Sequence, residues 1–187
     1  RTIRVCEDNG ASLTVSSWVT VMNNESAGIF FGENGGITTF TGFNPIGAIG
    51  FVDGTLSLAN CIFDYEVTIN WMYNNAALKL GPGTEFNYGI DASSPRLYLN
   101  GAKFDNYCDL RKTGSGDDNS LGGNEFKPGT TSRIYNEGSG DLALGTLNPD
   151  IFNGFTEIIN NSAASHIHVA KSSVGNQING TVYLNNG

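Results

Sequence analysis

The stretch FNGFTEI at residues 152–158 returns as INGTVYL at residues 178–184. Three related copies lie earlier in the chain: FDYEVTI from Phe63, FNYGIDA from Phe86 and FDNYCDL from Phe104. Each copy begins with an apolar residue, continues with Asn or Asp, and then alternates polar and apolar positions. A phrase that returns in this way indicates an internal repeat, which determines the architecture of the whole chain.

The first apolar residue of each copy serves as an anchor that places the repeats along the chain. Successive anchors are 18 to 26 residues apart. This loose period of about two dozen residues suits stacked coils whose corners accept insertions, and it does not suit helical hairpin repeats of about 34 residues or more. The anchors are Val15, Phe40, Phe63, Phe86, Phe104, Phe126, Phe152 and Ile178.

Each unit contains two short alternating segments. The residues four and six positions after the anchor are mostly apolar, as Val67 and Ile69 illustrate, and this period of two predicts a strand with one buried face. Asn, Gly and Ser separate the segments, and these residues tolerate the backbone angles of sharp corners. The second segment carries another apolar set: Phe30, Leu56 and Leu58, Leu78 and Leu80, Leu97 and Leu99, Leu142 and Leu144, and Ile167 and Val169.

The sequence therefore predicts an all-β protein, a parallel β-helix of about eight coils with two main strands per coil. Coils of this kind bury a core only by stacking, so we expect Phe63, Phe86 and Phe104 to form one interior column. A single domain is expected over residues 1–187, with a less regular N-terminal coil at 1–39 and repeats at 40–187. An antiparallel β-sandwich is the alternative fold, because it also uses many short strands.

Composition limits the classes of partner. The net charge is −8 and only 15% of residues are charged, which argues against nucleic acid and anionic membrane surfaces. No apolar run approaches the roughly 20 residues of a spanning helix, so no membrane insertion is expected. Cys61 lies two residues before one anchor and Cys108 four residues after another, so both face the interior at positions that are not equivalent. We expect no disulfide between them. The sequence does not indicate whether Cys6 is buried or bonded.

The repeated phrase resembles the β-helical repeats of very large secreted surface proteins of Bacteroidetes-type bacteria. Residues 150–158 and 175–184 carry the resemblance best, and it weakens toward the N-terminus. The resemblance implies secretion, an extracellular or cell-surface location, and a structural or adhesive role without catalytic residues. It also agrees with the expectation that this chain is a processed product or a piece of something longer.

An outward column five positions after each anchor is the sharpest chemical candidate. It places Asp91 and Asp109 on adjacent coils, about 5 Å apart by strand spacing. Such a pair suits a Ca²⁺ ion or an acid and nucleophile pair, and its alternative is two solvated charges beside Arg96, Arg111 and Lys112. The column consists of Thr20, Pro45, Thr68, Asp91, Asp109, Thr131, Glu157 and Tyr183.

Other polar segments provide further candidates. The glycine-rich corner at residues 114–120 offers oxygen ligands from Asp117 and Asp118, for which Ca²⁺ is the cofactor to consider, although it lacks the spacing of known Ca²⁺ loops. His166 and His168 flank Ile167 and point outward from one strand, but no third metal ligand is evident near them in the sequence. They are therefore expected to be solvent-exposed histidines.

Outward aromatic residues are the candidates for binding. Tyr98, Tyr107 and Tyr183 each lie at outward positions of predicted strands, where rings stack on sugars or simply pack on the sheet surface.

The sequence as a whole predicts a non-enzymatic extracellular structural or adhesive module. It is expected to be a segment of a large surface protein or a protomer of an extracellular fibre, with copies of itself or neighbouring repeats as end-to-end partners. The alternative is a carbohydrate-binding or polysaccharide-cleaving β-helix that uses Asp91, Asp109 and Glu157 and has glycans as partners.

Overall fold

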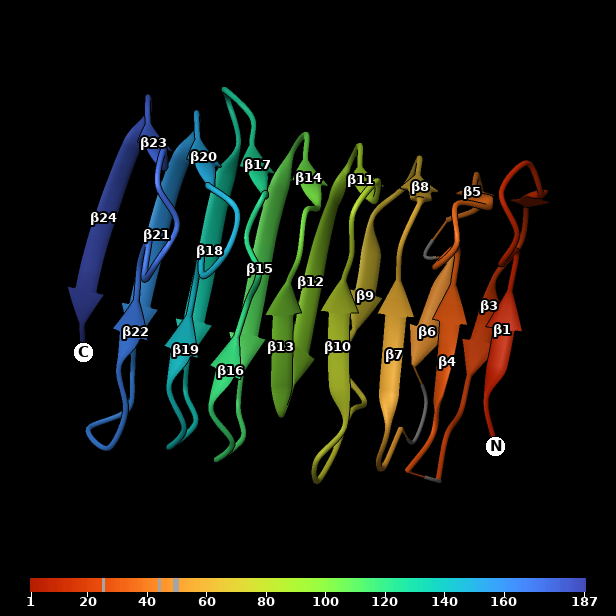
Figure 1. The fold of residues 1–187 in the computed structure, drawn as a ribbon, viewed down its shortest axis with the longest axis horizontal. Coiled ribbons are helices and arrows are strands. Elements are labelled where there is room, and N and C mark those ends of the chain that lie inside the picture. Colours follow the sequence, from red (N-terminus) through yellow and green to blue (C-terminus); the bar gives the residue numbers. More distant parts are fainter. Residues whose placement is uncertain (25, 44, 49–50) are drawn as a thin grey trace.

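The computed structural model describes residues 1–24, 26–43, 45–48 and 51–187. The chain winds into an elongated β-solenoid of about seven turns, and its strands follow one another along the long axis in sequence order (Figure 1). Within these residues every regular element is a strand, and no helix has the length and apolar character needed to cross a bilayer.

Three faces of the solenoid carry most of the strands. The leucine sheet contains β1 (Ile3–Val5), β4 (Gly28–Phe31), β7 (Thr55–Leu58), β10 (Ala77–Leu80) and β13 (Arg96–Leu99). The phenylalanine sheet contains β2 (Ser12–Val15), β5 (Ile37–Phe40), β8 (Cys61–Phe63), β11 (Glu85–Phe86), β14 (Lys103–Phe104), β17 (Glu125–Phe126), β20 (Ile151–Phe152) and β23 (Gln177–Ile178). The long-strand sheet contains β9 (Val67–Ile69), β12 (Gly89–Ser94), β15 (Tyr107–Lys112), β18 (Thr131–Asn136), β21 (Phe155–Asn160) and β24 (Thr181–Asn186).

Two smaller sheets complete the solenoid. A two-stranded sheet pairs β3 (Val19–Val21) with β6 (Ile46–Ala48), between the phenylalanine and leucine strands of the early coils. A three-stranded sheet contains β16 (Asp118–Asn119), β19 (Leu142–Ala143) and β22 (Ile167–His168), and it follows β13 along the solenoid.

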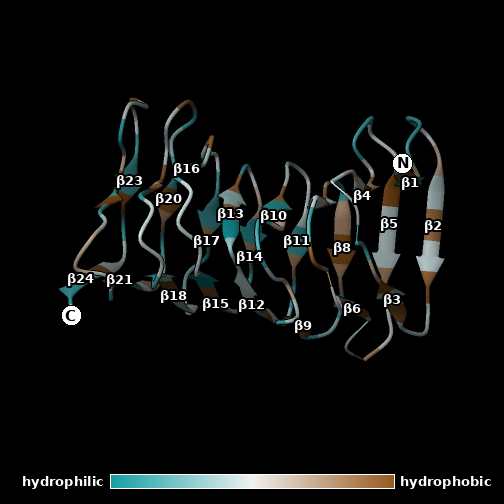
Figure 2. Cartoon of the chain, turned by 90° about the horizontal axis from the view of Figure 1, so that it is seen from below, coloured by the Kyte–Doolittle hydropathy of each residue, from teal (hydrophilic) through white to brown (hydrophobic). Residues whose placement is uncertain are grey.

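Every pair of named strands is parallel, as expected when each strand stacks on the equivalent strand of the next coil. Seen after a turn of 90°, β12, β15, β18 and β21 run along one edge of the solenoid, apart from the row with β8 and β11 (Figure 2). The predicted parallel β-helix is confirmed, and the antiparallel sandwich is wrong. The coils contain a third, short strand beyond the two predicted, because the anchor forms its own two- to four-residue strand.

The predicted anchor column is confirmed in full. Backbone pairing places each of the eight anchors opposite the next, from Val15 to Ile178. The rings of Phe63 and Phe86 are stacked with centroids 5.0 Å apart, and those of Phe86 and Phe104 are 5.6 Å apart. This spacing follows the distance of about 4.8 Å between neighbouring strands, so the rings continue the backbone ladder into the core.

The leucine sheet supplies the opposite wall of the core. Leu56, Leu78 and Leu97 are in register and fully buried. In β4 the interior residues are Ile29 and Phe31, so the prediction that Phe30 faces the core is wrong by one position. A shift of one residue turns a strand side chain to the other face, and Phe30 instead packs its ring under the Arg4 guanidinium.

Proline marks the two places where the register predicted for the outward column fails. Ile90 and Cys108 each lie four residues after their anchors and pair with each other, but the next partner of Cys108 is Ser132, six residues after Phe126. The additional residues form a turn at Pro128, in which the Thr130 amide donates to the Lys127 carbonyl. The same two-residue insertion before Ile46 displaces Pro45 from the outward column, and Gly47 takes its place beside Thr20.

All three cysteines are free. Cys61 and Cys108 are buried in the core, as predicted, and burial raises the pKa of the Cys108 thiol to about 12. Cys6 is partly buried, and its thiol donates to the Ile37 carbonyl.

Replacing Phe86 by Ala should lower the free energy of unfolding by about 3–5 kcal/mol, because it removes a fully buried ring from the middle of the stack. Urea unfolding measures the change. Tyr88→Ala is the matched control, since that ring is 56% exposed and its loss should cost less than about 1 kcal/mol. Equal effects of the two substitutions would contradict the interior column.

Candidate functional site

The outward column of the long-strand sheet brings the predicted acidic pair together. Asp91 lies opposite Asp109 in the register of β12 and β15, and Thr68 lies opposite Asp91. Beyond Asp109 the predicted column was wrong: Arg133, and not Thr131, is the next residue. The two-residue insertion at Pro128 causes this shift. Glu157 and Tyr183 then follow in the predicted positions.

Arginines engage the acids of this column. Arg111 lies 2.8 Å from a carboxylate oxygen of Asp109, and the Arg133 Nε lies 2.7 Å from Glu157. The pKa of Asp109 is raised, mainly by burial; Arg111 opposes this effect and the negative charge of Asp91 adds to it. The raised pKa is one feature of a catalytic pair, but Asp109 and Glu157 are each already paired with an arginine.

Two of the predicted binding tyrosines are already in contact with other side chains. Tyr98 is near two cations, with its ring centroid 5.8 Å from the Lys79 ammonium and 5.5 Å from the Arg96 guanidinium. The Tyr107 hydroxyl donates to Glu66, and its ring crosses the opposing Gly89, where a Cβ would lie 2.5 Å from a ring carbon. Burial and the Glu66 contact raise the pKa of Tyr107.

Sequence reasoning missed a pair of rings that are free on the surface. Tyr65 and Tyr88 stack with centroids 5.8 Å apart and are 44% and 56% exposed. Both stand two positions after an anchor, so the repeat itself contained the signal. Of the three predicted tyrosines, Tyr183 is comparably exposed, at 53%.

The glycine-rich corner at residues 114–120 joins the coils. Asp118 is buried; its carboxylate accepts from the Arg96 Nε at 2.8 Å and from the Leu97 amide at 2.9 Å. Ser120 accepts from the Leu99 amide in the same way, so two side chains substitute for backbone pairing between β13 and β16. The carboxylate of Asp117 accepts from the Asp141 amide. The carboxylates of Asp117 and Asp118, predicted as Ca²⁺ candidates, thus serve as structural acceptors.

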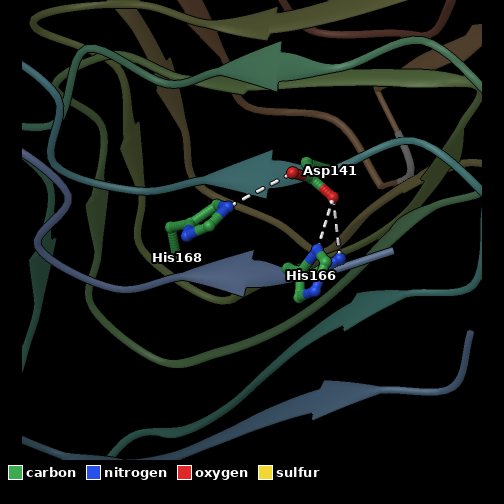
Figure 3. A group of neighbouring side chains, drawn as sticks. All are labelled: Asp141, His166 and His168. Carbon is green, nitrogen blue, oxygen red and sulfur yellow. Dashed lines mark hydrogen bonds and ion pairs between the residues drawn. The ribbon is translucent and has the colours of Figure 1, made fainter. Parts of the chain in front are cut away.

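The histidine pair acquires the third ligand that the sequence did not reveal. Pairing of β19 with β22 sets Leu142 opposite Ile167, which places Asp141 beside His166. Its carboxylate lies between the two imidazoles: Oδ1 is 3.2 Å from His166 Nδ1 and Oδ2 is 3.2 Å from His168 Nε2 (Figure 3). Within the described residues, this is the one group of three or more His, Cys, Asp or Glu side chains arranged to hold a metal ion.

Backbone geometry fixes this group. The amide of His166 donates to Asp141 Oδ1 at 2.8 Å, and the amide of Leu142 donates to the His166 carbonyl at 3.0 Å. The His166 amide and the two imidazoles lower the pKa of Asp141 to about 2. The carboxylate is therefore ionised at neutral pH and aimed between the rings, with His166 77% exposed to solvent.

Comparison of the chain with protein-family models, curated proteins and solved structures found no significant match.

A buried lysine supports the corner that carries Asp141. Lys112 is fully buried, and its ammonium donates to the carbonyls of Gly114 at 2.8 Å and Gly140 at 2.9 Å. Burial lowers its pKa. Asn136 follows it in the same row, and its side-chain amide also donates to Gly140.

Lys112→Met should lower the free energy of unfolding by about 1–3 kcal/mol, because it keeps the aliphatic stem but removes the two hydrogen bonds of the ammonium to the Gly114 and Gly140 carbonyls. Thermal or urea unfolding measures this, and Lys171→Met at an exposed corner position is the control. If the Lys112→Met variant is as stable as the wild type, desolvating the ammonium costs as much as its two bonds return.

Proposed function

We propose that this protein is an extracellular structural or adhesive module, a segment of a large surface protein or a protomer of an extracellular fibre. The extracellular location rests on the resemblance of its repeats to those of secreted bacterial surface proteins. The solenoid supports the structural part of the proposal, since stacked coils make a stiff, extended body that grows by addition of further coils.

Most ion pairs on the outer surface of the solenoid join side chains of neighbouring coils. Lys103 pairs with Glu85 at 2.9 Å, Lys127 pairs with Asp105 at 2.7 Å, and each pair joins neighbouring units. Exposed pairs of this kind contribute only about 0–1 kcal/mol each. Their arrangement nevertheless favours coils stacked in register, as a structural module requires.

The observation that supports the proposal best is the exposure of the interior row of the last coil, which consists of the inward-facing residues Ile178 and Leu184. Leu184 is 67% exposed and Ile178 is 60% exposed, whereas the equivalent Ile158 and Phe152 of the preceding coil are 3% and 1% exposed. In this chain β24 is also an edge strand, with backbone groups available for another parallel strand. Each earlier coil buries this row under the next one, so a further coil from a neighbouring repeat or a second copy would bury Ile178 and Leu184 in the same way.

We expect the isolated 187-residue chain to assemble end to end as its concentration rises, forming unbranched fibres one solenoid wide. Light scattering and electron microscopy measure the assembly. The double variant Ile178→Lys and Leu184→Lys should abolish it, because charges on the interior row oppose a stacked coil. Tyr183→Lys changes the outward side of the same strand and should leave assembly intact. A wild-type chain that stays monomeric would overturn end-to-end stacking.

Carbohydrate binding is the second candidate function, and the exposed Tyr65 and Tyr88 pair favours it. Two neighbouring rings 5.8 Å apart on consecutive coils offer an apolar face of the kind that stacks on sugar rings. We propose this pair, in place of Tyr98 and Tyr107, as the contact of an adhesive module with glycans.

A glycan array should show binding that falls at least about fivefold when Tyr65 and Tyr88 are both changed to Ser. Tyr98→Ser is the control, because its ring already contacts Lys79 and Arg96, and it should bind as the wild type does. In a reducing-sugar assay we expect no release from any ligand by the wild type or by Asp109→Asn. Release that Asp109→Asn abolishes would replace the structural proposal with a polysaccharide-cleaving one.

A further inference from the structure

The cluster of Asp141, His166 and His168 has the composition of a transition-metal site. It offers two imidazole nitrogens and one carboxylate oxygen, all within 4.8 Å of one another. Ligands bound to one ion at about 2.0–2.2 Å lie roughly 3–3.5 Å apart in a tetrahedral site, and the two carboxylate–imidazole contacts are already 3.2 Å. The three donors therefore lie close enough for rotation of the side chains to bring them around one ion.

The ligand set also selects the class of metal. Imidazole favours Zn²⁺, Cu²⁺ and Ni²⁺, whereas Ca²⁺ and Mg²⁺ take oxygen ligands. The backbone amide of His166 holds Asp141 Oδ1 at 2.8 Å, the kind of supporting contact that orients a metal-binding carboxylate. Because His166 is 77% exposed, solvent has access to the remaining coordination positions.

We propose that Asp141, His166 and His168 form a binding site for one divalent transition-metal ion, of which Zn²⁺ is the natural probe. The three ligands come from neighbouring coils: Asp141 directly precedes β19, and the histidines belong to the β22 segment. The bound ion therefore clamps one coil to the next, in addition to the parallel pairing of these short strands. This site does not depend on the proposed structural or adhesive function. In a structural module, the bound ion would stiffen the contact between these two coils.

The test titrates the untagged full chain with Zn²⁺ by calorimetry, and with Cu²⁺ followed by electron paramagnetic resonance. We expect one Zn²⁺ per chain, and a Cu²⁺ spectrum with two coupled imidazole nitrogens. His166→Ala and His168→Ala should each weaken binding at least tenfold and leave one coupled nitrogen. Asp141→Asn should weaken binding while keeping the acceptor for the His166 amide.

Asp109→Asn is the control, because it removes an aspartate from a different sheet and should leave Zn²⁺ affinity unchanged. Thermal unfolding adds a second measurement: Zn²⁺ should raise the melting temperature of the wild type and of Asp109→Asn, but not of the histidine variants, since ligands of the folded state stabilise it. Wild-type Zn²⁺ affinity no greater than that of the histidine variants would overturn the site, as would preferential binding of Ca²⁺. Circular dichroism establishes that each variant is folded.

Discussion

The stacking of equivalent side chains on parallel strands is the constraint on which the rest of this solenoid depends. Equivalent residues of neighbouring coils are about 4.8 Å apart. Each phenylalanine ring of the column therefore stacks directly on the ring of the preceding coil. The observed centroid separations of the Phe column, from 4.6 to 5.6 Å, follow that spacing. Since rings and backbone repeat at the same distance, burial and hydrogen bonding reinforce each other in every coil.

This constraint explains where the coils are permitted to differ. An insertion within a ladder would displace the residues that pair there, and an insertion of one residue would also turn buried side chains outward, so insertions are confined to corners. The Pro128 turn adds two residues between the anchor and the long strand and leaves both ladders in register. Near β16, the side chains of Asp118 and Ser120 accept hydrogen bonds from the Leu97 and Leu99 amides. These polar side chains maintain the stacking where the backbones of β13 and β16 do not pair.

The same stacking brings chemical groups together on the surface. Residues that lie one coil apart in sequence become neighbours about one strand spacing apart. In this way Asp109 meets Asp91 and Arg133, and Asp141 meets the two histidines of the following coil. The surface contacts of a solenoid therefore depend on the exact number of residues in each corner, and a change of two residues replaces Thr131 by Arg133 in the column.

The sequence alone determined the fold class, the anchor column and the pairing of Asp91 with Asp109, because these follow from a local period of two repeated along the chain. It also indicated that His166 and His168 point outward from one strand. Only the tertiary structure decided that Asp141 lies between them and that Tyr107 contacts Glu66. The physical reason is that corner lengths and side-chain directions set which residues of adjacent coils meet, and neither leaves a periodic signal in the sequence.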